Sequence, residues 1–189
     1  MNSAVAVLCL CLLAASAQAG VQISPGKCPD DVKVVQNFDA QAYMGHWYEI
    51  EAFFQIWELA GKCSTADYAL NEDGSKVIVK NNMKSLIGSD VSQEGYAVVT
   101  STTGEAKLEV TFDVPIFGER SANYLVLDTD YENYSLVYSC ANVLGFKYES
   151  AWILGREKTL DAASSEKVEA AIKAAKLKRK AFRPTKQDC

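Results

Sequence analysis

The sequence predicts an all-β fold in which eight antiparallel strands form a barrel or a sandwich, followed by one C-terminal α-helix. Two observations support this prediction. Eight short runs rich in β-branched and aromatic residues follow one another, and no helical segment separates them. After the last run, the spacing of apolar residues changes from the period of a strand to that of a helix.

The strand runs are bounded by residues that favour turns. Asn71–Gly74, Ser101–Gly104 and Asp128–Asp130 are rich in Gly, Asn, Asp, Ser and Thr and are predicted to be turns. The segment Lys107–Phe112 alternates polar and apolar residues, as a strand with one buried face does. The predicted strands are His46–Phe54, Thr65–Leu70, Lys76–Met83, Ser92–Thr100, Ala106–Val114, Ser121–Leu127, Tyr134–Ala141 and Tyr148–Leu154.

One amphipathic helix is predicted from Asp161 to about Leu177. This segment is rich in Ala, Glu and Lys, and its apolar positions form a narrow stripe that would pack on the outside of the sheet. The stripe consists of Val168, Ala171, Ile172 and Ala175. The basic run 176–180 is interpreted as a solvated helix end that complements the helix dipole, with an anionic partner as the alternative.

Residues 1–19 are predicted to be a signal peptide. The apolar stretch from Ala4 to Ala15 is too short to span a bilayer, and Ala17-Gln18-Ala19 matches a cleavage site. Cleavage would leave residues 20–189 as a single secreted domain. No second long apolar segment follows, so no transmembrane segment is expected.

Charge and cysteine content exclude several function classes. A formal net charge of −5 argues against a nucleic-acid partner. Cys28, Cys63, Cys140 and Cys189 would remain after cleavage, and in an oxidising compartment they are expected to form two disulfides, with three possible connectivities. No Cys-x-x-Cys pair is present, so no metal site is expected.

The residues for catalysis are also lacking, so an enzyme is not expected. His46 is the sole histidine and is interpreted as an outward-facing polar residue. With every remaining cysteine paired, no thiol nucleophile is left.

Three short motifs occur in an order that resembles the lipocalin family. Gly45-His46-Trp47 resembles the Gly-x-Trp signature, Thr129-Asp130-Tyr131 resembles the second signature, and Arg156 follows the last strand run as the third requires. The chain looks most similar to the branch that contains apolipoprotein D and the insect bilin-binding proteins. The segments that carry this similarity are Gly26–Pro29, Asn37–Asp39, Trp47–Glu51, Asp130–Tyr134, Leu136–Cys140 and Ala151–Leu154.

The resemblance implies an eight-stranded up-and-down barrel that holds one small ligand and is closed at its base. In the family, the signature tryptophan and arginine close that base, which implies that Arg156 stacks on Trp47 in this chain. It also implies the disulfides Cys28–Cys140 and Cys63–Cys189.

Ligand-binding residues are expected toward the open end of such a barrel. The resemblance, combined with strand alternation, predicts the following inward-facing residues: Asn81, Met83, Gln93, Phe112, Val114, Ala122, Tyr124, Ser139, Tyr148 and Trp152. Trp57 is added from the loop Gln55–Leu59, which is unusually apolar at Ile56 and Trp57. This loop is either a lid that contacts the ligand or another molecule, or a loop docked by its own side chains.

The resemblance implies a carrier, and biliverdin or a related bilin is the favoured ligand, bound without a covalent bond. The alternatives are a fatty acid, a sterol, a retinoid or a carotenoid. A second class of function is a subunit of a pigment or lipid-particle assembly that is recognised through the apolar rim loop. Homo-oligomerisation and glycosylation at Asn133, within Asn133-Tyr134-Ser135, are left open. Arg120, Lys80 and Lys84 are expected near the mouth, where a bilin's propionates would favour basic groups.

Overall fold

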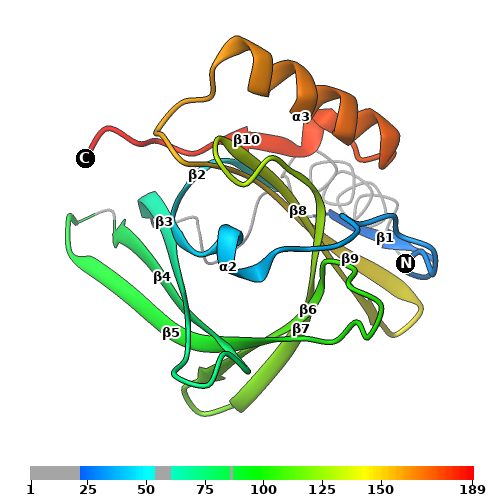
Figure 1. Ribbon diagram of the computed structural model, residues 1–189, viewed down its shortest axis with the longest axis horizontal. Helices are drawn as coiled ribbons and strands as arrows, with labels where there is room; N and C mark the ends of the chain where they lie inside the picture. Colours follow the sequence, from blue (N-terminus) through cyan, green and yellow to red (C-terminus); the bar gives the residue numbers. More distant parts are fainter. Residues whose placement is uncertain (1–21, 54–60, 86) are drawn as a thin grey trace, which may run out of the picture.

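A closed β-barrel forms the body of the molecule (Figure 1). The computed structural model describes residues 22–53, 61–85 and 87–189. Within them, strands β2 to β9 pair antiparallel in sequence order, and an additional pairing of β9 with β2 closes the sheet on itself. The predicted eight-stranded antiparallel barrel is therefore confirmed. The strands are β2 Gly45–Phe53, β3 Gly61–Leu70, β4 Val77–Ser85, β5 Asp90–Val99, β6 Lys107–Val114, β7 Gly118–Thr129, β8 Tyr134–Val143 and β9 Phe146–Gly155.

The up-and-down order gives the barrel two distinct ends. The short helix α2 (Ala40–Tyr43) crosses one end of the barrel in Figure 1. The β3–β4, β5–β6 and β7–β8 connections lie at this end, which we call the closed end. The β4–β5, β6–β7 and β8–β9 connections lie at the opposite end, which we call the open end.

Two short strands that the sequence did not predict extend the sheet, one beside β2 and one beside β9. Strand β2 pairs with β3 only from Gly45 to Tyr48, so the two strands separate toward the open end. There β10 (Phe182–Pro184) pairs with the end of β2, while β1 (Gln22–Pro25) pairs with β9. Both segments supply partners to backbone groups that would otherwise form exposed sheet edges.

The C-terminal tail continues from β10 into the gap between β2 and β3. The backbone N–H of Cys63 donates to the carbonyl of Lys186 at 2.7 Å. The side-chain amide of Gln187 donates to the carbonyls of Glu49 and Ser64 at 2.8 and 2.9 Å. The tail therefore forms part of the barrel wall.

Two disulfides tie distant segments of the described chain to the barrel. Cys28 is bonded to Cys140, 112 residues away, and Cys63 is bonded to Cys189, 126 residues away. This is the connectivity that the family resemblance implies. The first bond holds the N-terminal segment against β8, and the second holds the tail against β3.

The C-terminal helix α3 (Ala162–Ala174) packs outside the barrel, against β7 and β8. The carboxylate of Asp161 caps its first turn by accepting from the N–H of Ser164, and Val168 and Ile172 of the predicted stripe are buried. The helix ends three residues before the predicted Leu177. Lys176 takes a positive φ of 56°, and the N–H of Leu177 bonds back to Ile172, which stops the helix. No helix in the described residues is long and apolar enough to cross a membrane.

Most of the predicted strands are shorter than the observed ones at the open end. Strand β3 begins at Gly61 rather than Thr65, β7 begins at Gly118 rather than Ser121, and β9 begins at Phe146 rather than Tyr148. The described connections at this end place exposed apolar residues such as Ile116 and Leu144 within the turns, so composition alone does not mark where the strands begin. The predicted turn Asp128–Asp130 is also displaced, because Asp128 and Thr129 still pair with β8.

We predict that the tail disulfide stabilises the barrel. Replacing Cys63 and Cys189 together by serine should lower the free energy of unfolding by about 2–4 kcal/mol, because the cross-link restricts the unfolded chain. Denaturant titration measures this loss, and non-reducing peptide mapping of the unaltered protein should recover the Cys28–Cys140 and Cys63–Cys189 peptides. A Cys28–Cys63 peptide would contradict the connectivity.

Candidate functional site

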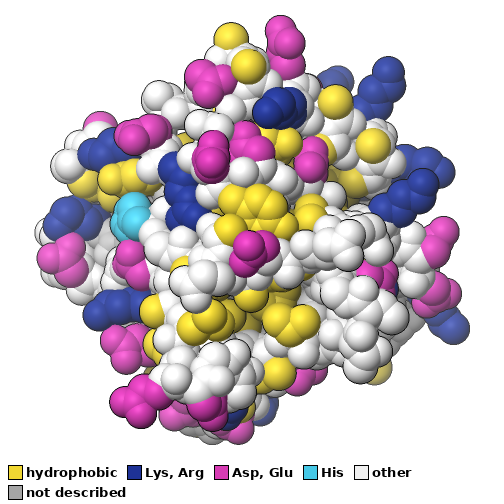
Figure 2. Space-filling model, viewed as in Figure 1, with side chains coloured by type: hydrophobic (Ala, Val, Ile, Leu, Met, Phe, Trp, Pro, Cys, Tyr) yellow, Lys and Arg dark blue, Asp and Glu magenta, His cyan; other side chains and the backbone are white. Residues whose placement is uncertain are grey.

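The closed end is built around Trp47, which has no exposed surface. Its indole N–H donates to the carbonyl of Tyr43 in α2 at 3.0 Å, and the two rings lie 5.2 Å apart. Figure 2 views the molecule from the α2 side and shows this end covered by side chains, with hydrophobic ones across its middle. This end of the barrel is therefore filled.

Arg156 holds the closed end together. Its guanidinium carbon lies 3.7 Å from the centre of the Trp47 ring. The same group donates to three backbone carbonyls at 2.8–3.0 Å, those of Met44, His46 and Tyr131. One side chain thus joins α2, β2 and the β7–β8 connection through stacking and charge-assisted hydrogen bonds.

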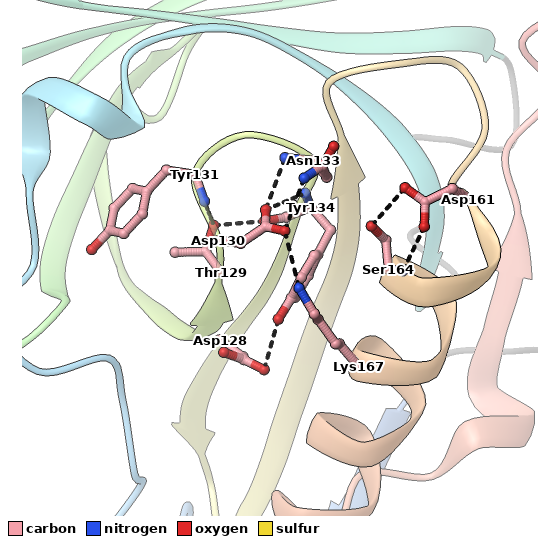
Figure 3. Close-up of polar contacts among 9 residues, drawn as sticks. All are labelled: Asp128, Thr129, Asp130, Tyr131, Asn133, Tyr134, Asp161, Ser164 and Lys167. Atoms are coloured by element: carbon pink, nitrogen blue, oxygen red, sulfur yellow. Dashed lines mark hydrogen bonds and ion pairs between the residues drawn. The ribbon is translucent and has the colours of Figure 1, made fainter.

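The second signature motif shapes the β7–β8 connection (Figure 3). The hydroxyl of Thr129 donates to the carbonyl of Tyr134 at 2.6 Å and accepts from the N–H of Tyr131. The carboxylate of Asp130 accepts from the N–H groups of Asn133 and Tyr134, and Lys167 of α3 lies 3.5 Å away. The turn therefore presents the carbonyl of Tyr131 to Arg156.

Asn133, the candidate glycosylation site, is exposed within this turn. Its side-chain amide donates to Asp130 at 3.0 Å, as Figure 3 shows. Ser135, the third residue of the motif, is fully buried. Glycosylation at Asn133 stays a prediction.

The register of the strands identifies the inner face of the barrel. Trp47 pairs with Ala66, Ala66 with Asn81, and Asn81 with Gln93. Cross-strand partners share a face and successive residues alternate, so every second residue along each strand faces inward. The predicted residues of β4 to β9 all lie on this inner face by register: Asn81, Met83, Gln93, Phe112, Val114, Ala122, Tyr124, Ser139, Tyr148 and Trp152.

Exposure along the inner face changes from one end of the barrel to the other. Near the closed end, Val137 and Leu154 are buried, whereas Val143 and Phe146 are exposed at the open ends of the same strands. In the middle of the barrel, Tyr124 is half-buried although the wall surrounds it. The interior is therefore accessible from the open end.

Several predicted residues have further partners or lie outside the described residues. The hydroxyl of Ser139 donates to Asn123 at 2.9 Å. Lys80 lies on the outer face near Glu94, whereas Arg120 pairs with Phe112 and so lies on the inner face. Trp57, Ile56 and the loop Gln55–Leu59 lie outside the described residues, as do residues 1–19.

A chain of hydroxyl groups inside the barrel, next to α2 at the closed end, was not predicted from the sequence. The hydroxyl of Tyr43 lies 2.9 Å from that of Ser135 and 3.0 Å from that of Tyr124, which lies 3.2 Å from that of Tyr68. Burial raises the pKa of Tyr68 to about 12, and it raises the pKa values of Tyr43 and Tyr124 as well, so these phenols stay protonated even at mildly alkaline pH. Alternation within β3 identifies Tyr68 as inward-facing only once the register with β2 is known, and Tyr43 comes from α2, outside the strands.

Glu49 is a further inner-face residue that was not predicted. It is buried, and within the described residues its side chain has one hydrogen bond, from the hydroxyl of Thr185 in the tail. Burial raises the pKa of the Glu49 carboxyl above its usual value, and the Thr185 hydrogen bond partly offsets this rise.

A shallow recess also lies outside the barrel, between α3 and strand β2. Apolar residues including Ile50, Ile153 and Val168 line it. Arg179 lies across it and bonds to Glu51 and Glu169, each at 2.6 Å.

His46 lies on the outer face of the barrel, where its ring nitrogen is 2.6 Å from Asp67, as expected for an outward-facing polar residue.

Comparison with known proteins decides the family. A lipocalin-like domain is matched over residues 38–187. The chain belongs to the lipocalin family. It is 41% identical to apolipoprotein D of Macaca fascicularis over 160 residues, covering 82% of each chain. It is 36% identical to insecticyanin-B of Manduca sexta over 168 residues, covering 84% of this chain and 77% of the relative.

Solved structures agree with this assignment. The structure of insecticyanin from the tobacco hornworm Manduca sexta superposes with a TM-score of 0.79 at 30% identity and covers 88% of this lipocalin and 89% of that chain. Lobster apocrustacyanin A1, at 24% identity and a TM-score of 0.72, shares the fold.

We predict that Arg156 matters for folding more than for binding. Replacing it by alanine should lower the free energy of unfolding by about 2–3 kcal/mol, because several charge-assisted hydrogen bonds and the contact with Trp47 are lost. Arg156→Lys is the matched control that keeps the charge but not the planar group, and it should lose most of the same stability. Denaturant titration measures both, and an unchanged stability of Arg156→Ala would contradict the structural role.

We also predict a pH dependence from Glu49. Its pKa is raised in the folded state, so the folded protein holds a proton that the unfolded chain releases, and stability falls as pH rises above the ordinary carboxyl pKa. Glu49→Gln should remove this loss. The stability difference between the variant and the unaltered protein should therefore grow in favour of the variant from pH 4 to pH 7, and a constant difference would contradict the assignment.

Proposed function

We propose that this lipocalin is an extracellular carrier that binds one small hydrophobic molecule noncovalently inside the barrel, with a biliverdin-type tetrapyrrole as the favoured cargo. The observation that carries the proposal is the accessible inner face above a filled closed end. An eight-stranded barrel is wide enough for side chains and one small ligand.

The composition of the inner face supports a hydrophobic cargo. Phe112, Val114, Trp152 and Met83 supply aromatic and aliphatic surface, whereas Asn81, Gln93 and Ser139 supply a few polar groups. Small-molecule sites are typically lined in this way. Burial of apolar ligand surface at about 25 cal/mol per Å² provides affinity without a covalent bond.

Two observations favour a bilin among hydrophobic ligands. The chain resembles the insect bilin-binding proteins in sequence, and Arg120 lies on the inner face near the open end, where a propionate would reach solvent. Lys84 is less suited to this role, because it is paired with Asp90 at 2.6 Å. All four cysteines of the described residues are in disulfides, so a thioether to the pigment is not proposed.

A fatty acid, sterol, retinoid or carotenoid is the alternative cargo, since the same apolar surface would accommodate these molecules. Binding rather than catalysis is proposed in each case. The sole histidine, His46, is on the outer face, away from the barrel interior.

We propose that residues 20–189 act as one secreted domain after removal of residues 1–19. The two disulfides suit an oxidising compartment.

Native mass spectrometry combined with an absorption spectrum tests the proposal on protein purified from its source. A complex one bilin heavier than the apoprotein, with the absorption of a blue pigment, is expected. A colourless complex of a different mass would show that the cargo is not a bilin and would favour one of the alternative ligands. Protein that carries no ligand and binds none of these classes on titration would contradict the carrier function.

A variant that fills the interior locates the bound ligand. Ala122→Trp places a large ring on the inner face and should weaken biliverdin binding at least about tenfold, because it occupies space that the ligand needs. Glu109→Trp is the matched control, since Glu109 is exposed on the opposite face of the adjacent strand. Equal affinities of the two variants in an absorption titration would exclude the interior as the site.

A further inference from the structure

The three connections at the open end present apolar side chains to solvent. Ile87 in the β4–β5 connection is 89% exposed, Ile116 in the β6–β7 connection is 100% exposed, and Leu144 in the β8–β9 connection is 96% exposed. Phe117, beside Ile116, is 64% exposed. We call these four residues the apolar tips.

The connections at the closed end have the opposite character. Residues 71–76, 100–106 and 130–133 are polar except for Ala106 and Tyr131. Ala106 is buried and Tyr131 is half-buried. Isolated exposed apolar residues are ordinary on protein surfaces, but here they gather on every described connection of one end.

The backbone at two of the tips makes these residue types costly. Ile116 has a φ of 73°, and Leu144 has a φ of 48° and is followed by Gly145 at 83°. Two successive positive φ values between β8 and β9 define a hairpin turn that favours Asn or Gly at its first position. A β-branched residue at positive φ is also strained. Fold stability therefore does not explain Ile116 or Leu144.

We propose that the open end docks on an uncharged lipid surface, with the apolar tips inserted between the lipid head groups. The tips come from separate hairpins around the rim of the barrel. A fluid surface accepts separate points of insertion, and the strength of such binding scales with the apolar area buried. A stable protein interface instead requires a continuous patch of about 800 Å² on each partner.

The charge of the molecule selects the kind of lipid surface. Residues 86–89, 115–117 and 144–145 contain no charged side chain, and the formal net charge of the chain is −5. Lys84, next to the β4–β5 connection, is neutralised by Asp90 at 2.6 Å. Electrostatic attraction to anionic lipid is therefore absent from these connections, and zwitterionic lipid is the expected surface.

Docking in this orientation would turn the mouth of the barrel toward the lipid. If the proposed carrier function holds, a hydrophobic cargo would pass between lipid and barrel without crossing water. Only this consequence rests on the carrier function, because the docking itself needs nothing inside the barrel.

Co-sedimentation with phosphatidylcholine vesicles tests the proposal on the full secreted chain. The unaltered protein should bind, with little dependence on salt. The double variant Ile116→Asn and Leu144→Asn should bind at least about tenfold more weakly, because two inserted side chains are lost. The same variant should melt at a higher temperature than the unaltered protein, since Asn tolerates positive φ.

Ile78→Asn is the matched control. Ile78 is 44% exposed on the outer wall of β4, away from the tips, and its replacement should leave vesicle binding unchanged. Failure of the unaltered protein to bind phosphatidylcholine, or equal binding by the double variant, would overturn the proposal. Dimerisation that the double variant abolishes, without vesicle binding, would also overturn it and assign the tips to a contact between copies.

Biliverdin titration in vesicle-free buffer separates the two proposals. The double variant should retain the pigment affinity of the unaltered protein, whereas Ala122→Trp should bind biliverdin at least about tenfold more weakly and still bind vesicles. Loss of both properties in the double variant, despite a raised melting temperature, would contradict docking as an independent function of the tips.

Discussion

The stacking of Arg156 on Trp47 is the interaction on which the rest of the structure depends. A barrel that is open at both ends would be a water-filled tube, in which an apolar ligand gains little by entering. The guanidinium seals one end because it packs on the indole ring and also satisfies carbonyls from α2, β2 and the β7–β8 connection. The signature residues therefore act on the closed end, and the ligand-facing residues are free to differ.

Closure at one end gives the barrel a direction. Toward the closed end the inner-face side chains are buried and the connections are polar. Toward the open end the inner-face side chains are exposed, and the described connections carry exposed apolar residues. The wall itself is completed by segments from the two chain termini, since β1 and the C-terminal tail occupy the edges that β2 leaves uncovered. The tail also buries Glu49 through Thr185, so part of the interior depends on a segment held by Cys189.

Sequence patterns predicted the strands well because strands depend on local signals. The closed end was predicted only through the family resemblance, since Arg156 and Trp47 lie far apart in the sequence. Alternation, combined with the family resemblance, identified the inner-face residues, and Asn71–Gly74 and Ser101–Gly104 mark turns by composition. The open-end connections escaped prediction, since Ile116 and Leu144 stand where turns usually carry Gly or Asn. The hydroxyl chain and the site of β10 were also unpredictable, because Tyr43 meets Tyr124, and Phe182 meets Phe53, across more than 80 residues of chain.

A crystal structure of the protein with biliverdin bound tests the central claim most directly. The pigment should lie inside the barrel against Phe112, Tyr124 and Trp152, above an unchanged contact between Arg156 and Trp47. Pigment bound instead in the outer recess between α3 and β2, against Ile50 and Val168, would contradict the account, as would displacement of Arg156 from Trp47 on binding.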